Sequence, residues 1–117
     1  MYIIKTYKTE TGKRPFREWL NNLRDIQAKA TIETRLDRVI DGNFGQCEPV
    51  GNGVFELKVN FGPGYRVYFG KVGHQIILLL CAGSKRTQDK DIKLAKIFFE
   101  DYKRREHDHD NEKNYKK

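Results

Sequence analysis

Residues 42–83 constrain the fold most, because apolar and polar residues alternate there and glycines interrupt the pattern repeatedly. All but one of the ten glycines of the chain fall in this stretch. Residues 54–61 have a period of two, which is typical of a strand with one buried face. The alternation resumes over residues 65–69 after a Gly-Pro-Gly turn, and the apolar residues 75–82 follow a second tight turn. Short turns join antiparallel neighbours, so this stretch predicts a three-stranded antiparallel meander.

Helical patterns lie on both sides of the meander. A short β-rich segment at residues 2–7 comes first, and Pro15 then opens an apolar stripe with helical spacing. Asp25 is a suitable N-cap for a second helix. A last helix begins at Thr87 and keeps an apolar side as far as Tyr102. The order β-αα-βββ-α predicts an α+β domain in which helices pack on a mostly antiparallel sheet.

Length and the polar C-terminal segment set the expected domain boundaries. A chain of 117 residues has room for one domain. Residues 106–117 contain one aromatic residue and no apolar pattern that a core needs. We therefore expect a domain over residues 1–105 and a polar, disordered tail over residues 106–117.

The charge balance favours a partner that carries phosphate or acidic groups. Lysine and arginine number 23 against 16 acidic residues, which gives a net charge of +7. The longest apolar run, residues 76–82, is much shorter than the ~18 residues of a membrane-spanning helix. The N-terminal segment also lacks the apolar region of a signal peptide. We expect a cytoplasmic protein with no membrane partner, in which Cys47 and Cys81 are reduced thiols.

Motifs for nucleotide-binding loops and metal hydrolases are absent from the sequence. His107 and His109 alternate with aspartates, but they lie in the expected tail. No histidine stands beside a serine or cysteine on a predicted helix or strand, so a nucleophilic triad has no support. We therefore expect neither a metal site nor another cofactor.

Four cations and a tyrosine gather near the ends of the predicted strands. Lys58 and Arg66 lie on the polar faces of consecutive strands, and Lys85 and Arg86 follow the last strand of the meander. We expect the four to line one concave surface that binds RNA phosphate, with Tyr68 as a stacking platform for a base. The pattern alone leaves an ordinary solvated basic face as the alternative, since exposed lysine and arginine are common.

Such a surface has groups that promote RNA cleavage. Attack of the 2′-OH on the adjacent phosphorus needs an acceptor for its proton, stabilisation of the added negative charge, and a proton donor for the leaving 5′-oxygen. Lys58 is the candidate proton acceptor, because close like charges favour the neutral amine. Arg66 offers several guanidinium donors to the phosphate oxygens.

Several motifs resemble a known family in their order and spacing. They are Pro15-Phe16 with Trp19-Leu20, Gly51-x-Gly53-Val-Phe-Glu-Leu-Lys58, Gly62-Pro-Gly-Tyr-Arg66-Val-Tyr-Phe, Cys81-x-Gly83-x-Lys85 and Gln88-x-x-Asp91-Ile. With them the chain resembles the RelE/ParE toxin superfamily, and within it the HigB-like addiction-module killer proteins. The resemblance runs from about Tyr2 to about Tyr102.

The resemblance implies a RelE-like fold and the toxin of a type II toxin–antitoxin pair. Members typically inhibit translation by cleaving mRNA in the ribosomal A site without a metal. The implied partners are the ribosome, mRNA and a cognate antitoxin, usually a helix-turn-helix protein. By position, Arg66 matches the strand arginine that contacts the scissile phosphate, and Lys58, Lys85 and Arg86 match the surrounding basic residues.

The chain departs from this family at the start of its last helix. RelE-type nucleases usually carry a tyrosine or histidine there, whereas residues 88–94 contain neither. After Lys58, Arg66 and Lys85, Asp91 is the remaining candidate for a catalytic role, although an acid at such a position more often caps a helix or orients an arginine. Two alternatives therefore stay open: a non-catalytic nucleic-acid-binding module, and a ParE-like toxin that inhibits DNA gyrase.

Overall fold

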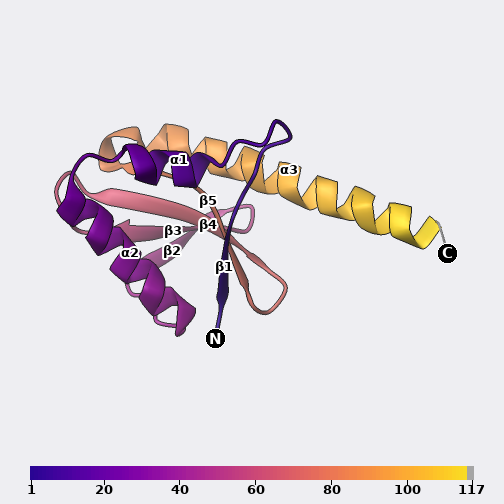
Figure 1. Ribbon diagram of the computed structural model, residues 1–117, viewed down its shortest axis with the longest axis horizontal. Coiled ribbons are helices and arrows are strands. Elements are labelled where there is room, and N and C mark those ends of the chain that lie inside the picture. Colours follow the sequence, from indigo (N-terminus) through magenta and orange to yellow (C-terminus); the bar gives the residue numbers. More distant parts are fainter. Residues whose placement is uncertain (116–117) are drawn as a thin grey trace.

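The sheet has five strands, one more than the sequence pattern predicted. The computed structural model describes the backbone of residues 1–115 and the side chains of residues 1–107. The strands are β1 (Ile3–Thr6), β2 (Cys47–Gly51), β3 (Val54–Val59), β4 (Tyr65–Val72) and β5 (Ile76–Ser84). They lie in the order β1-β5-β4-β3-β2, with β2 to β5 antiparallel and β1 parallel to β5 (Figure 1). The predicted α+β class and the antiparallel meander are confirmed.

The strand that sequence analysis missed is β2. Pro49 lies in its middle, and proline is found in sheets only where its missing N–H has no partner strand to serve. β2 forms an edge of the sheet and pairs with β3 alone, with a shift of register between Pro49 and Gly51. Pro49 argued against a strand in the sequence, and the strand is possible only because β2 lies at the edge of the sheet.

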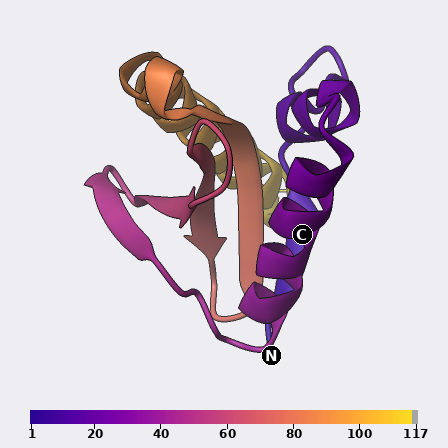
Figure 2. The ribbon, with the colours of Figure 1, turned by 90° about the vertical axis from the view of Figure 1, so that its left-hand side faces the viewer.

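Helices cover both faces of the sheet. α1 (Pro15–Asn22) and α2 (Ile26–Ile40) lie on one face, and α3 (Gln88–Tyr115) lies on the other (Figure 2). Asp25 caps α2 as predicted, since its side chain accepts two backbone N–H groups of the first turn at 3.0 and 3.1 Å. With helices on both faces, β5 is buried along most of its length, which its nearly continuous apolar sequence predicted.

Two apolar clusters hold these layers together. Between the sheet and the α1–α2 pair, the buried residues include Phe16, Ile32 and Val67. Between the sheet and α3 they include Tyr68 and Phe99. Each strand of the centre therefore contributes side chains to both clusters.

α3 is longer than the sequence predicted. A 3₁₀ turn, η1 (Lys85–Thr87), precedes it with Ser84 as N-cap. The helix then continues to Tyr115, so the backbone is helical where we expected a disordered tail (Figure 1). Helical hydrogen bonds are local and glutamate and lysine are good helix formers, so this extension needs no buried face. Neither α3 nor any other helix in the described part of the chain is long and apolar enough to cross a membrane.

Candidate nucleic-acid interface

The cations that were predicted to bind RNA lie where three strands end. Lys58 on β3 is the cross-strand partner of Arg66 on β4, and Arg66 is paired in turn with Gly83 on β5. β5 leads directly into η1, which carries Lys85 and Arg86. The structure thus places the four cations at one end of the sheet, beside the start of α3. We call these four residues the cationic surface.

The carbonyl of Gly64 links Arg66 to η1. Arg66 Nη1 donates to this oxygen at 2.9 Å, and the backbone N–H of Lys85 donates to it at 2.8 Å. Gly64 has a φ of +79°, and a Cβ there would come within 3.3 Å of Arg66 Nη1. A glycine in the β3–β4 turn therefore lets the guanidinium and η1 approach each other closely.

A buried carboxylate, Glu56, lies behind Arg66. The Glu56 side chain is 1% exposed, and its Oε2 is 3.7 Å from Arg66 Nε. The same oxygen accepts hydrogen bonds from Tyr68 Oη at 3.1 Å and from Gln88 Nε2 at 2.7 Å. Removal of two charges from water is favourable only when they compensate each other, so Glu56 and Arg66 depend on one another. The charge of Glu56 thereby stabilises the Arg66 side chain, which is 12% exposed, at the end of the sheet.

Both the side chain and the backbone carbonyl of Lys58 have charged partners. Its Nζ is 2.6 Å from Oε1 of Glu48 on β2. Arg35 on α2 donates to the carbonyl of Lys58 and, at 3.0 Å, to that of Phe44. Burial, and after it the charge of Arg38, lowers the pKa of Arg35. A phosphate that binds Lys58 therefore competes with Glu48 for the ammonium group.

Tyr68 is not available for stacking, so this part of the predicted site is wrong. Its side chain is fully buried beneath α3, and its hydroxyl donates to Glu56. Burial, followed by the charge of Glu56, raises the pKa of Tyr68. The alternation of β4 placed Tyr68 on a polar face, but α3 covers that face with Ala95 and Phe99. The tyrosine therefore supports the Glu56–Arg66 pair from the interior.

Asp91 is turned toward the sheet. It is 7% exposed, and its Oδ2 accepts a hydrogen bond from Thr87 Oγ1 at 2.5 Å. A Cβ on Gly83 would lie 1.9 Å from this oxygen, so the glycine gives the first turn of α3 its close approach to β5. Among the described residues, no ion pair joins Asp91 to the cationic surface. The geometry makes Asp91 a buried partner of the Thr87 hydroxyl at the start of α3, which does not support the predicted catalytic role.

Lys85 and Arg86 are exposed and border a shallow hollow. The hollow has a volume of about 360 Å³ and is formed by residues 85–90, which include Asp89 and Lys90. The helix dipole favours an anion at this end, although the first N–H of η1, that of Lys85, already donates to the Gly64 carbonyl. An anion in this hollow would meet three cations, Lys85, Arg86 and Lys90, against the single acid Asp89.

The cationic surface is equipped to stabilise negative charge. Glu56 and Asp91 are buried and already accept hydrogen bonds, so neither carboxylate is placed to accept a proton from RNA. Within residues 1–107, no group of three histidine, cysteine or acidic side chains is arranged to hold a metal ion. The surface therefore contributes binding and electrostatic stabilisation to any reaction on a phosphate.

Sequence reasoning missed the three residues that support the cations. Glu48 lies in the strand that Pro49 disguised. Glu56 stands two positions before Lys58 on the same face of β3, and this alternation was the signal that could have found it. Gln88 reaches Glu56 from α3, a contact between residues 32 positions apart that no local pattern shows.

The fold and the surface together define a class of protein: an α+β domain with a five-stranded mixed sheet, helices on both faces and a cluster of cations at one sheet end. No protein-family model matches the chain. A protein of Haemophilus influenzae named "Uncharacterized protein" is 48% identical over 82 residues, which cover 70% of this chain and 83% of that protein. The chain belongs to the same family as this H. influenzae protein.

Proposed function

We propose that the chain is the toxin of a type II toxin–antitoxin system with a RelE-like fold, and that it inhibits translation by cleaving mRNA on the ribosome. The observation that carries the proposal is the placement of Arg66. Glu56 holds it from the interior and Gly64 fixes its Nη1, next to Lys85 at the start of α3. The motifs that resemble the HigB-like killer proteins supply these same residues.

In the proposed reaction, the 2′-oxygen attacks the adjacent phosphorus and the bond to the 5′-oxygen breaks. The products are a 2′,3′-cyclic phosphate and a 5′-hydroxyl end. Arg66 stabilises the charge on the non-bridging oxygens, and Lys85 and Arg86 bind neighbouring phosphates. The 2′-OH loses its proton to water or to a group of the ribosomal A site, and the 5′-oxygen takes up a proton from the same surroundings. Because the proton acceptor and the proton donor come from the ribosomal A site and its water, the proposed reaction depends on the ribosome.

The test is cleavage of a reporter mRNA on programmed ribosomes, with the new 5′ ends mapped. We expect cuts at codon boundaries that require the ribosome. Arg66→Ala loses cleavage by about a hundred-fold or more, because a positioned donor to the developing charge is removed. Arg24→Ala removes the same charge from the exposed connection between α1 and α2 and keeps wild-type activity. A folded Arg66→Ala protein with normal cleavage contradicts the role of Arg66.

A non-catalytic nucleic-acid-binding module is the second candidate. It is favoured by the burial of Tyr68 and Asp91, which removes two of the side chains that were predicted to act on RNA. Salt-dependent RNA binding with no cuts on programmed ribosomes supports this candidate against the first. Loss of gyrase supercoiling activity with intact mRNA supports a ParE-like toxin instead.

The proposal includes a cognate antitoxin, a helix-turn-helix protein, and a cytoplasmic location where ribosomes are present. The experiment is co-expression of the chain with the product of a neighbouring gene. We expect growth arrest by the chain alone and normal growth when both proteins are made. Expression of Arg66→Ala alone is the control. If this variant still arrests growth, the arrest is a general effect of expression and not the proposed activity.

A further inference from the structure

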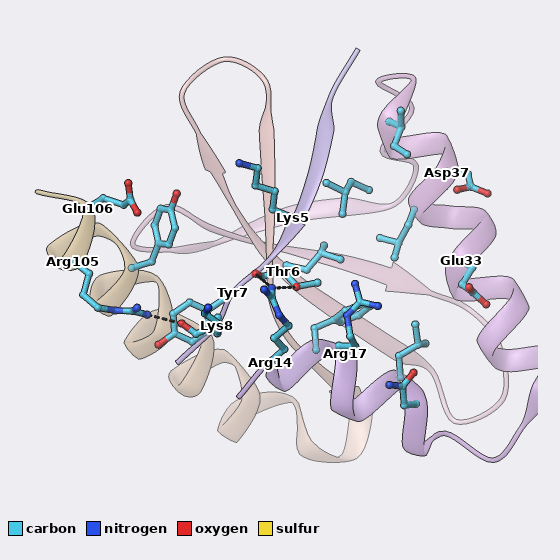
Figure 3. A pocket seen from close by; sticks show the side chains of 18 residues that line it. Lys5, Thr6, Tyr7, Lys8, Arg14, Arg17, Glu33, Asp37, Arg105 and Glu106 are labelled. Atoms are coloured by element: carbon cyan, nitrogen blue, oxygen red, sulfur yellow. Dashed lines mark hydrogen bonds between the residues drawn. The ribbon is translucent and has the colours of Figure 1, made fainter. Parts of the chain in front are cut away.

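A hollow of about 950 Å³ lies between β1, α1, α2 and the part of α3 around Arg105 (Figure 3). None of its lining residues belongs to the cationic surface. Its apolar lining residues include Ile4, Phe16, Leu20, Leu36 and Leu79. A hollow of this size and composition is typical of a binding site, and we call it the β1 groove.

One wall of the β1 groove is an open strand edge. β1 is the last strand of the sheet on its side and pairs with β5 alone. The N–H groups of Ile3 and Tyr7 donate toward β5, at 2.7 and 2.9 Å. Because successive residues of a strand face opposite sides, the N–H groups of Ile4 and Thr6 point to the outer edge. An edge with such groups is a template for another strand.

The open part of this edge is short, because neighbouring elements close both of its ends. The N–H of Tyr2 donates to the carbonyl of Ile40 at the end of α2, at 2.8 Å. At the other end, Arg14 donates to the carbonyl of Thr6 at 3.1 Å, and Arg105 of α3 donates to the carbonyl of Lys8 at 2.6 Å. The N–H groups of Ile4 and Thr6 stay open between these two ends, and we call this part of the edge the window.

The two sides of a strand added at this window meet different chemistry. Toward α1 and α2, it meets the apolar side chains of Leu20 and Leu36. On the other side of β1, Lys5 is exposed, and Figure 3 shows Lys5, Lys8 and Arg17 around the groove. The lining residues include the cations Lys5, Lys8, Arg14, Arg17 and Arg105 and the acids Glu33, Asp37 and Glu106. Four of these cations lie in or beside β1 and α1, whereas the acids lie on α2 and α3. The fifth cation, Arg105, is already paired with Asp101, so the positive charge that a partner would meet is concentrated beside β1.

We propose that the β1 groove binds an extended segment of a partner protein, in which apolar and acidic residues alternate, as an added strand on β1. The segment pairs with the open window, places its apolar side chains against α1 and α2, and directs its acidic side chains to Lys5 and Lys8. A second copy of this chain fits less well, because antiparallel β1–β1 pairing brings two Lys5 side chains opposite each other. The proposal does not depend on the proposed function, since the two surfaces share no residue.

Labelled peptides test the backbone pairing. A short peptide that alternates valine with glutamate binds, and we expect a block peptide of the same composition to bind at least ~10-fold more weakly, because only alternation separates the two faces. Two further versions carry N-methyl groups on one or the other edge of the peptide strand. We expect only one version to lose binding, by more than ~10-fold, because a single edge faces β1. Equal binding of both versions overturns the proposal, as does no binding of the alternating peptide.

Variants of the chain locate the site. We expect Lys5→Glu to weaken binding of the alternating peptide by at least ~5-fold, because it places an acid opposite the acidic face. Lys93→Glu makes the same change of charge on exposed α3, outside the groove, and leaves binding unchanged. The amide signals of Ile4 and Thr6 shift when the peptide binds. Shifts at Arg66 and Lys85 in their place, or a dimer of the chain that excludes the peptide, overturn the proposal.

Discussion

The side chains of the cationic surface differ in what holds them. Arg66 has a buried carboxylate behind it, and Lys58 pairs with Glu48 at the edge of the sheet. Lys85 and Arg86 are exposed in η1. A cation fixed by a partner keeps its direction when substrate binds, whereas an exposed cation adjusts to the phosphate that it meets. In the proposed reaction we therefore expect Arg66 to position the reacting phosphate and Lys85 and Arg86 to bind its neighbours.

The ion pair with Glu48 changes the expectation for Lys58. A proton acceptor cannot be replaced by arginine, which stays protonated, so that role predicts a loss of cleavage in Lys58→Arg. A lysine that serves as a paired charge is replaceable, and we expect Lys58→Arg to keep cleavage within about threefold, because a guanidinium also pairs with a carboxylate. Lys58→Ala weakens RNA binding and lowers the salt slope by about 0.7. Single-turnover cleavage and binding at two salt concentrations measure both variants.

A different result is expected if Lys58 accepts the proton of the 2′-OH. Lys58→Arg would then bind RNA as the wild type does and lose most of its cleavage. Lys85→Arg is the matched control, since it makes the same replacement on η1, and it keeps both activities under either assignment of Lys58.

Tyr68 allows the Glu56 pair to be tested through stability. Tyr68→Phe removes the hydroxyl that donates to Glu56 and leaves a buried carboxylate with one hydrogen bond fewer. We expect the free energy of unfolding to fall by about 1–2 kcal/mol, measured by urea denaturation. Tyr2→Phe is the control, since it removes a hydroxyl from a partly exposed tyrosine at the start of the chain. An unchanged midpoint in Tyr68→Phe would show that Glu56 does not need this donor.

At the scale of the elements, α3 is attached to the sheet near both ends of its buried part. At its start, Asp91 meets Thr87 beside Gly83. Further along, Tyr7 Oη donates to Asp101 Oδ2 at 2.5 Å, and Arg105 donates to the same carboxylate from one turn ahead, at 2.8 and 3.0 Å. Burial, and after it the bond to Asp101, raises the pKa of Tyr7 to about 12. The second attachment joins α3 to the segment that follows β1.

This second attachment predicts a pH dependence of stability. Burial alone would raise the pKa of Asp101, but hydrogen bonds from Tyr7 and Arg105 lower it below its ordinary 3.8. A carboxyl whose pKa is lower in the folded than in the unfolded state stabilises the fold above about pH 4. That stabilisation is lost as the pH falls through the folded-state pKa. Urea denaturation at pH 7 and pH 3 measures the difference.

We expect Asp101→Asn to be less stable than the wild type at pH 7 and to lose less stability on acidification to pH 3. Asp37→Asn, an exposed aspartate on α2, provides the control and retains the wild-type pH dependence. An equal loss of unfolding free energy between pH 7 and pH 3 in Asp101→Asn and the wild type would show that Asp101 does not cause the loss of stability in acid.

At the scale of the whole molecule, two charged surfaces share no residue. The cationic surface lies at the ends of β3, β4 and β5, and the β1 groove lies along β1, the edge strand that pairs with β5. A partner segment on β1 therefore leaves the cationic surface uncovered by direct contact. A net charge of +7 attracts polyanions in general, and salt screens this attraction over distances of about 10 Å.

Salt dependence separates the two surfaces. We expect the logarithm of the RNA affinity to fall linearly with the logarithm of salt, and Arg66→Ala and Lys85→Ala each to reduce the slope by about 0.7. Lys5→Glu changes the charge of the β1 groove and leaves the slope within about 0.3 of the wild type. Binding of a short single-stranded RNA at several salt concentrations gives the slopes. A larger effect of Lys5→Glu than of Lys85→Ala would place the RNA in the β1 groove.

The sequence by itself determined the elements whose signals are local. Alternation over residues 54–61 and 65–69 predicted β3 and β4, and the continuous apolar run predicted a strand covered on both faces. Asp25 predicted the start of α2, because a cap depends only on the next few residues. The placement of Lys58 and Arg66 on consecutive strands followed from the same alternation, since a tight turn fixes which residues are opposite each other.

Only the tertiary structure decided which polar side chains are buried and what they contact. Alternation shows that Glu56 and Tyr68 share a face, but not that α3, which begins at Gln88, covers it. The edge position of β2, which permits Pro49 and brings Glu48 to Lys58, is likewise a property of the assembled sheet. Burial depends on segments that are distant in the chain, and the cost of burying a polar group is met by partners that no local pattern identifies.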